Sequence, residues 1–255
     1  MAYTYKIHHL PTTSPDQDPT LLPFLAGKFA SLRLSALTVS SSAFSSTFAI
    51  ESLFTSSQWI SRLRRPLLHT FVAVAYSPST LPPDSQQQAQ NETQTIGRGD
   101  WIGSLTLLGP FTSSEFDIPE SGYSATDSEG IEIDDSSESK WQITAVYNSP
   151  LHRGQGVAKM LIQAAMDFAE KEGGKERTRV RIMIHPSNVV VKRLYEGLGF
   201  GDAGYCTLAE AYRSNGDEEM LPADGGGEYL FSSSFGARNG KRRGFVKYLL
   251  TRDSE

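Results

Sequence analysis

The stretch from His152 to Lys159 reads HRGQGVAK, and it separates a strand-like run from a helical pattern. Gly154 and Gly156 follow Arg153 and precede an apolar periodic segment. A strand that enters a glycine turn and then a helix exposes backbone N–H groups at the helix start, where peptide dipoles add partial positive charge. Glycine permits close backbone approach and positive φ, and arginine adds charge-assisted contacts to anions. The pattern predicts a phosphate-binding loop, with a plain tight turn as the alternative.

The residues around this loop predict alternating strands and helices. Strands are predicted over residues 3–10, 69–76, 101–109, 141–148, 178–185 and 244–250. Apolar residues at helical spacing predict one or two helices within 21–65, one over 156–172, and one that begins after Ser187 as its N-cap. The order strand, glycine loop, helix, strand, helix is a βαβα unit inside a mixed sheet.

Length and composition indicate one large domain over residues 1–255. Polar insertions are predicted near 79–97, 112–140 and 213–228, where few apolar residues occur. The formal net charge of −5 argues against nucleic acid as the main partner. The single cysteine, Cys206, excludes an internal disulfide and is interpreted as a buried small hydrophobe. Without a signal-like start or a membrane-length apolar run, we expect a cytoplasmic protein that does not contact membranes.

Two common nucleotide-binding loops do not fit the glycine pattern. A Walker loop requires Gly-Lys-Ser/Thr at its end, and the residues after Ala158 do not supply it. A Rossmann fingerprint requires a third glycine or alanine where Lys159 stands, and no acidic residue ends the following strand. Both interpretations are therefore rejected.

Two blocks of this sequence resemble the GNAT acetyltransferase superfamily. The segment VYNSPLHRGQGVAKMLIQAAMDFAE is similar to its acetyl-CoA-binding signature, Arg/Gln-x-x-Gly-x-Gly/Ala, at Arg153, Gly156 and Ala158. The segment HPSNVVVKRLYEGLGF is similar to the next block of the family, at Asn188, Tyr195, Gly199 and Phe200. The resemblance covers about residues 141–200. It suggests a fungal-type member through the strand WIGSLTLLG and the long insertions.

The resemblance implies an α/β (α+β) GNAT fold: a mixed, mostly antiparallel central sheet, flanked by helices, with a splayed pair of parallel strands. In that gap the pantetheine arm of the co-substrate acetyl-CoA would contact the strand backbone at Val146, Tyr147 and Asn148. The pyrophosphate would be held by N–H groups of Arg153, Gly154, Gln155, Gly156, Val157 and Ala158. Asn188 would bond the pantetheine arm, and the Val146 N–H would polarise the thioester carbonyl.

The implied reaction is direct acetyl transfer from the thioester to an amine. Tyr195 matches the family's general acid, with a core aromatic as its alternative role. His185 is the first candidate for the base, with a structural histidine as its alternative. Glu51 is expected to be a surface carboxylate rather than a base, and Glu132, Asp134 and Asp135 are expected to be solvated charges. Deprotonation through water, without a dedicated base, is a further alternative.

The expected acceptor is a primary amine of a small molecule. A non-catalytic acyl-CoA-binding or sensing module and a protein or peptide N-acetyltransferase remain alternatives. No metal is expected, because the sequence contains no ligand cluster. The last predicted strand could present an edge for a homodimer.

Overall fold

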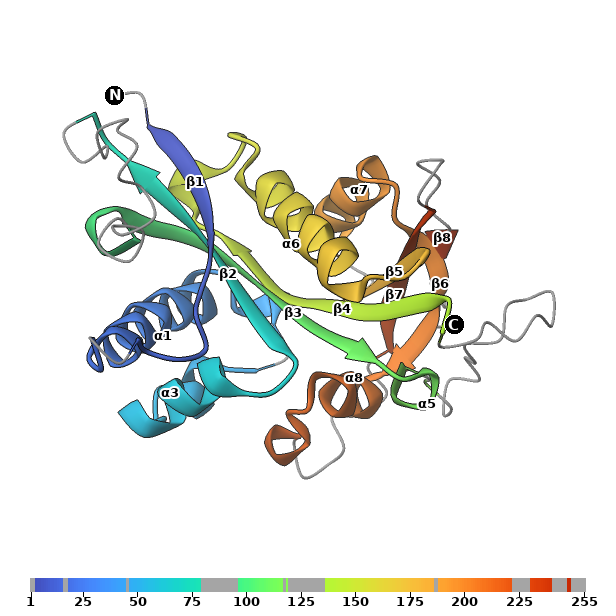
Figure 1. Cartoon of the computed structure of the whole chain (residues 1–255), viewed down its shortest axis with the longest axis horizontal. Helices are drawn as coiled ribbons and strands as arrows, with labels where there is room; N and C mark the ends of the chain where they lie inside the picture. The colour runs from blue at the N-terminus through green and yellow to red at the C-terminus, as the bar shows by residue number, and fades with distance from the viewer. Residues whose placement is uncertain are drawn as a thin grey trace. The chain divides into compact units, whose positions relative to one another are not determined.

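The computed structural model describes most of the chain (Figure 1). The described residues are 3–15, 18–44, 46–78, 96–116, 118, 136–185, 188–221, 230–239 and 247–248. Much of each predicted polar insertion lies outside these residues. The single-domain organisation and the insertion boundaries therefore stay predictions.

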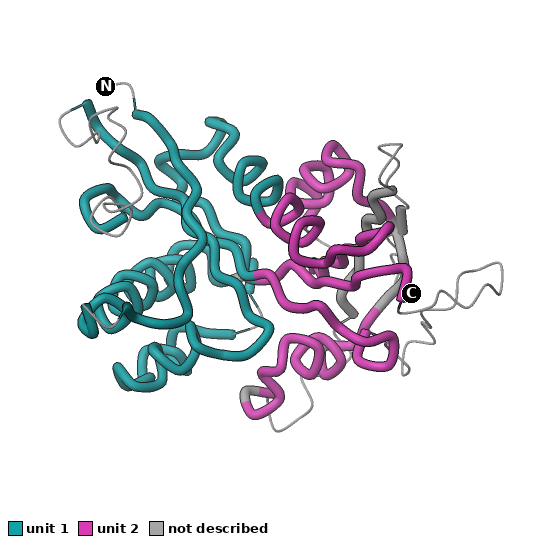
Figure 2. Tube along the Cα trace, viewed as in Figure 1, with its two compact units in different colours: residues 1–106, 145–164 teal, residues 107–144, 165–255 magenta. Residues whose placement is uncertain are grey.

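The chain forms two compact units, which Figure 2 colours separately. Unit 1 comprises residues 1–106 and 145–164, and unit 2 comprises residues 107–144 and 165–255. Three elements have residues in both units: β3 (Asp100–Phe111), β4 (Glu138–Asn148) and α6 (Val157–Gly173). The chain therefore passes from one unit to the other inside regular elements.

The sheet of unit 1 begins with two strands from distant parts of the chain. β1 (Thr4–His9) and β2 (Leu68–Tyr76) are antiparallel, in register from Thr4↔Tyr76 to His9↔Phe71. β3 and the last residues of β4 follow in the order β1-β2-β3-β4. β2 lies between two neighbours, and its side chains are almost all buried, as expected for a central strand. The strands predicted for these segments are confirmed.

The helices within residues 21–65 are shorter and more numerous than the one or two predicted there. They are α1 (Leu21–Val39), the one-turn η1 (Ser41–Ala43), α2 (Phe48–Glu51) and α3 (Ser56–Arg64). α3 begins at a capping box in which Thr55 and Gln58 exchange hydrogen bonds. Leu53 is 80% exposed, so the apolar residues from Phe44 to Trp59 do not form one buried helical face.

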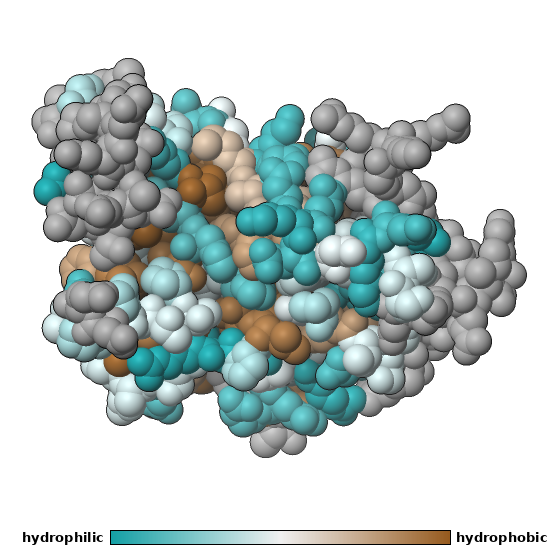
Figure 3. All heavy atoms as spheres, viewed as in Figure 1, coloured by the Kyte–Doolittle hydropathy of each residue, from teal (hydrophilic) through white to brown (hydrophobic). Residues whose placement is uncertain are grey.

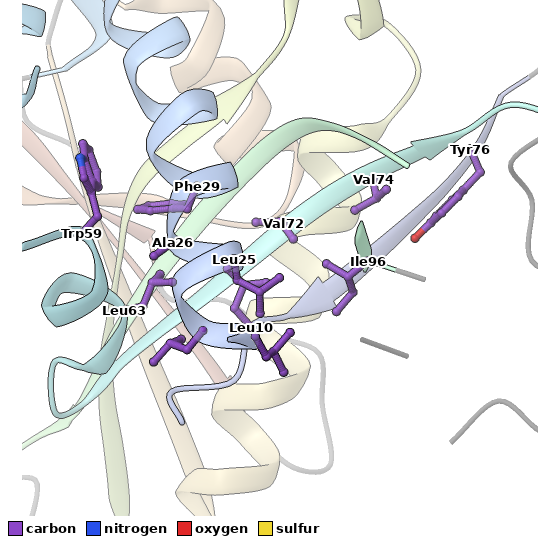
Figure 4. Packing of buried hydrophobic residues seen from close by; sticks show 12 residues of the cluster. Leu10, Leu25, Ala26, Phe29, Trp59, Leu63, Val72, Val74, Tyr76 and Ile96 are labelled. Carbon is purple, nitrogen blue, oxygen red and sulfur yellow. The ribbon is translucent and has the colours of Figure 1, made fainter. Parts of the chain in front are cut away.

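Figure 4 shows the core of unit 1. Leu25, Ala26 and Phe29 of α1 pack with Val72 and Val74 of β2. Trp59 and Leu63 of α3 belong to the same cluster, and the rings of Phe29 and Trp59 meet edge to face at 6.1 Å. Burial of each large apolar side chain contributes about 1.5–3 kcal/mol. This core fixes α1 and α3 against the sheet of unit 1.

The sheet of unit 2 contains the parallel pair. β4 and β5 (Arg177–Ile184) run parallel from Glu138↔Arg177 to Ile143↔Ile182. β7 (Leu230–Asn239) is antiparallel to both β5 and β6 (Gly201–Thr207), and β8 (Lys247–Tyr248) is parallel to β6. The predicted mixed, mostly antiparallel sheet with a parallel pair is confirmed. β4 begins three residues before its predicted start at Trp141.

β8 stands last in the strand order, at an edge. The remaining residues of the predicted strand 244–250 lie outside the described residues.

The helices of unit 2 follow or precede its strands. Besides the C-terminal part of α6 they are α5 (Ser113–Phe116), α7 (Val189–Gly197), α8 (Leu208–Asn215) and the one-turn η3 (Glu218–Met220). The predicted helices over 156–172 and after Ser187 are confirmed as α6 and α7. Gly199 has φ +85 and directly follows Leu198, the C-cap of α7, a position where glycine commonly ends a helix.

The face drawn in Figure 3 carries small groups of apolar residues among hydrophilic ones. Leu151, Val190 and Leu53 are the most exposed large apolar residues described, at 91%, 81% and 80%. Among the residues described, none of the helices combines the length and the apolar character that crossing a bilayer requires.

Candidate functional site

The end of β4 leads directly into the predicted donor loop within unit 1. Tyr147 is 5% exposed, and the N–H of Ser149 donates to the carbonyl of Ile102 on β3 at 2.7 Å. Gly103 of β3 lets these strands approach, because an added Cβ there would lie 2.8 Å from the Tyr147 carbonyl oxygen. β3 therefore holds the backbone of the predicted pantetheine-binding residues Tyr147 and Asn148.

Ala145 is an irregular residue within β4. Its φ is +54, a left-handed conformation that non-glycine residues adopt at a cost. It lies two residues after Ile143, where the pairing of β4 with β5 ends. A left-handed residue within a strand breaks the ladder and bends the strand, as in a β-bulge. This feature precedes Val146 directly and was not predicted from the sequence.

The glycine loop lies between the one-turn η2 (Pro150–His152) and α6. Gly154 and Gly156 both have φ +76, and space is open where their side chains would project. Val157 is fully buried and anchors the helix start. The first N–H groups of α6 have no acceptor within the helix, as at every helix start. The loop therefore presents unfilled space and backbone donors to an anion.

Arg153 is exposed and adds positive charge to this loop. Its Nη2 donates to Ser40 Oγ at 3.2 Å. Ser40 directly follows α1, so the guanidinium lies at the C-terminal end of that helix, where the dipole favours a cation. Ser40 was not identified from the sequence.

Tyr195 is a buried residue of α7 in unit 2. It is 1% exposed, and its ring meets Phe200 edge to face at 5.4 Å. Burial raises the pKa of the Tyr195 hydroxyl well above its ordinary value. The hydroxyl is therefore a weaker acid than that of an exposed tyrosine, and it stays protonated at neutral pH.

Asn188 caps the same helix. Its side-chain oxygen accepts the N–H of Val191 at 3.4 Å, and its own N–H donates to the His185 carbonyl at 2.9 Å. The N-cap is thus Asn188 and not Ser187, which lies outside the described residues. One residue separates the two positions, and both types cap well. The side-chain amide N–H groups of Asn188 are the part suited to donate to a ligand.

His185 directly follows β5 and is half-buried. The three candidate residues of unit 2 therefore lie close together in the sequence. His185 and Asn188 lie between β5 and α7, and Tyr195 lies in α7 itself.

Glu51 is not the surface carboxylate expected from the sequence. It is completely buried, and Arg33 binds it through Nε and Nη2, with the shortest contact at 2.6 Å. Arg62 Nη1 lies 3.4 Å from the same carboxylate. Burial alone would raise the pKa of Glu51, but the hydrogen bonds from Arg33 and the charges of Arg33 and Arg62 outweigh it and lower the pKa. A carboxylate so engaged is a poor proton acceptor and has a structural role.

The remaining acidic candidates, Glu132, Asp134 and Asp135, lie outside the described residues. Within the described part of the chain, no group of His, Cys, Asp and Glu residues could hold a metal ion. Cys206 is fully buried, which confirms its interpretation as a small hydrophobe.

The model of the Acetyltransferase (GNAT) family matches residues 123–200. This range contains both blocks that carry the resemblance, from the glycine loop to Tyr195. The match supports the GNAT superfamily and, with it, an N-acetyltransferase enzyme. No curated protein of similar sequence was found.

Solved structures with similar folds include several acetyltransferases. NAA60 of Arabidopsis thaliana, in complex with a bisubstrate analogue, has 12% identity, covers 96% of this chain and 100% of its own, and gives a TM-score of 0.47. A GNAT-family acetyltransferase of Streptococcus pneumoniae has 12% identity, coverages of 91% and 98%, and a TM-score of 0.49. The putative acetyltransferase yncA of Salmonella typhimurium, with acetyl-CoA, has 14% identity, coverages of 94% and 95%, and a TM-score of 0.47. Likeness at this level carries no argument about the acceptor.

Proposed function

We propose, from the GNAT family match over residues 123–200, that this chain is an acetyl-CoA-dependent N-acetyltransferase acting on a primary amine of a small molecule. The observation that carries the proposal is the glycine loop. Both of its glycines are left-handed, the space above them is open, and a long helix starts directly behind it. These are the requirements of a pyrophosphate-binding loop.

In this proposal the loop binds the donor. The Arg153 N–H donates to the Pro150 carbonyl at 3.3 Å, so in this proposal the N–H groups of residues 154–158 donate to the pyrophosphate oxygens. The Arg153 side chain supplies a positive charge at the same end. An anion at a helix start gains about 0.3–1 kcal/mol from the dipole at exposed sites. The backbone of Val146, Tyr147 and Asn148 is assigned to the pantetheine arm, together with the Asn188 side chain.

Two proton transfers accompany the reaction. The amine loses a proton as it attacks the thioester carbonyl, and the departing CoA sulfur gains one. We assign the second step to Tyr195 because it matches the tyrosine of the second family block, with a core aromatic as its alternative role. His185 is proposed as the base, with water as the alternative.

Acetyl-CoA binding tests the proposal first. Calorimetry with the full chain should show binding of one acetyl-CoA, and turnover should follow when small primary amines are added. Folded protein that gives no heat with acetyl-CoA would contradict the proposal. Binding without turnover of any amine would favour the non-catalytic module, and turnover of peptides alone would favour the peptide enzyme.

Tyr195→Phe tests the acid. A general acid contributes about 10²–10⁴-fold to rate, so kcat should fall by at least about 10²-fold while the Kd for acetyl-CoA is unchanged. Tyr212→Phe is the matched control, because Tyr212 is another buried tyrosine of unit 2, 2% exposed. Equal activity of the two variants would exclude the acid role.

A further inference from the structure

His152, the residue that opens the glycine loop, is held through both its side chain and its backbone. The hydroxyl of Tyr5 lies 3.2 Å from His152 Nδ1. The side-chain amide of Asn148 donates to the His152 carbonyl at 3.2 Å. The His152 N–H donates to the Ser149 carbonyl at 2.9 Å. Three contacts thus fix one residue immediately before Arg153.

The side-chain contact comes from the first strand of the protein. Tyr5 belongs to β1 and is 147 residues away from His152 in sequence. The His152 ring also meets the rings of Tyr3 and Tyr5 edge to face, at 5.2 and 5.7 Å. Tyr3 directly precedes β1 and is separated from Tyr5 by one residue, as are side chains that share one face of a strand. The rings of Tyr3 and Tyr5 therefore both pack against the His152 imidazole.

The adjoining loop needs such an anchor. Leu151 is 91% exposed and Arg153 to Gly156 are all exposed, so little packing restrains these residues. Gly154 and Gly156 add conformational freedom, since glycine loses the most backbone entropy on ordering. A loop ordered before the ligand arrives binds more tightly, because less freedom is lost on binding.

We propose that Tyr5 and His152 are positioning residues of the donor loop: the contact from β1 holds the loop in the conformation that binds the CoA pyrophosphate. The proposal rests on the acetyl-CoA function proposed above. Neither residue is required to touch the reacting atoms. Loss of the contact should therefore change donor binding and leave the chemical step intact.

Tyr5→Phe is the sharpest test, because it removes the hydroxyl and keeps the ring. Loss of one neutral hydrogen bond should raise the Kd for CoA roughly 3- to 10-fold. Tyr3→Phe is the matched control, since the ring of Tyr3 meets the His152 ring edge to face and is kept in this variant, so the Kd should not change. Calorimetry with CoA measures both, and thermal melting checks that both variants are folded.

His152→Ala and His152→Asn extend the test. Alanine removes the hydrogen bond and the ring contacts, so we expect the KM for acetyl-CoA to rise about 10-fold at unchanged kcat. Asparagine places a polar nitrogen or oxygen close to the position of Nδ1 and should restore part of the affinity. A general structural defect would lower kcat and the melting temperature and would not be rescued by asparagine.

The outcomes separate this proposal from the proposed function. If the unaltered protein does not bind CoA, the function itself fails. If it binds CoA and Tyr5→Phe binds equally well, the function stands and the positioning role of Tyr5 is wrong. If kcat and kcat/KM for acetyl-CoA fall by the same factor in His152→Ala, the residue acts in the chemical step and the positioning role is also wrong.

Discussion

At the scale of single residues, Glu51 illustrates how buried charge differs from exposed charge. Replacing it with glutamine leaves Arg33 and Arg62 without their shared carboxylate. Removing one partner of a buried ion pair costs about 3–5 kcal/mol. We expect Glu51→Gln to lower the free energy of unfolding by about that amount, measured by urea denaturation. The exposed Glu172→Gln should change it by less than about 0.5 kcal/mol, and equal effects would contradict the structural role.

The same carboxylate predicts a pH dependence. The arginines lower the pKa of Glu51 in the folded state despite its burial, whereas a glutamate in the unfolded chain has a pKa of about 4.3. The stability from this pair is therefore fully present above about pH 4.3 and is lost as the pH falls through the lower folded pKa. The difference in unfolding free energy between the protein and Glu51→Gln should shrink with acidification below that pH. A constant difference would refute the assignment.

Alanine substitutions at two glycines, Gly103 and Gly27, should change the stability of the protein in opposite directions. At Gly103 the new Cβ would lie 2.8 Å from the Tyr147 carbonyl oxygen, so Gly103→Ala should destabilise the protein by about 1–3 kcal/mol through overpacking. Gly27 is within α1 and has nothing within 4 Å of the added atom. Gly27→Ala should stabilise by about 0.4–1 kcal/mol. Thermal melting of both variants checks the signs, and a shift in the same direction for both would contradict the geometry.

At the scale of elements, α8 was not predicted, although both of its ends are specified by local sequence signals. Thr207 and Glu210 form a capping box, and Gly216 ends the helix with φ +62. The segment TLAE at residues 207–210 contains the start signal, and Gly216 supplies the stop signal, so these residues predict a short helix between them. β7 is different, since Ser232, Ser233 and Ser234 are poor strand formers by propensity. Its ladders to β5 and β6 on both sides decide its conformation.

The capping box of α8 can be tested by itself. Thr207→Ala removes the side-chain oxygen that accepts the Glu210 N–H at 3.1 Å, and should cost about 1 kcal/mol of stability. Thr207→Ser keeps this oxygen and should be nearly neutral. Chemical denaturation of both variants measures the difference. Equal stabilities would show that the cap does not contribute.

At the scale of the whole molecule, three elements connect the two units through their backbones. We expect both units to unfold in one transition. Each of β3, β4 and α6 has residues in both units, so unfolding of one unit alone would leave these elements partly unfolded. Trp59 lies in the core of unit 1, and Cys206 in that of unit 2.

Cys206 provides the second probe of that transition. Burial, opposed by the charge of Arg181 and reinforced by that of Glu210, raises the pKa of Cys206 to about 12. A thiol reagent should therefore label Cys206 only after unfolding. Trp141 lies in unit 2, so fluorescence is measured in Trp141→Phe, in which the remaining tryptophans, Trp59 and Trp101, belong to unit 1. In this variant, labelling of Cys206 and tryptophan fluorescence should follow the same denaturant curve. Labelling at a lower denaturant concentration would show that unit 2 opens independently.

The sequence by itself determined the features that consecutive residues encode. The glycine loop, the helix behind it and most strands were predicted correctly, because helical periodicity, strand alternation and turn chemistry are local. The left-handed conformation of Ala145 was visible only in the structure. The Arg33–Glu51 pair and the contacts of Tyr3 and Tyr5 with His152 join residues distant in sequence, and only the tertiary structure decided them. Their physical origin is long-range packing, which places residues 147 positions apart within hydrogen-bonding distance. HRGQGVAK therefore specified the loop, and the first strand specified how its first residue is held.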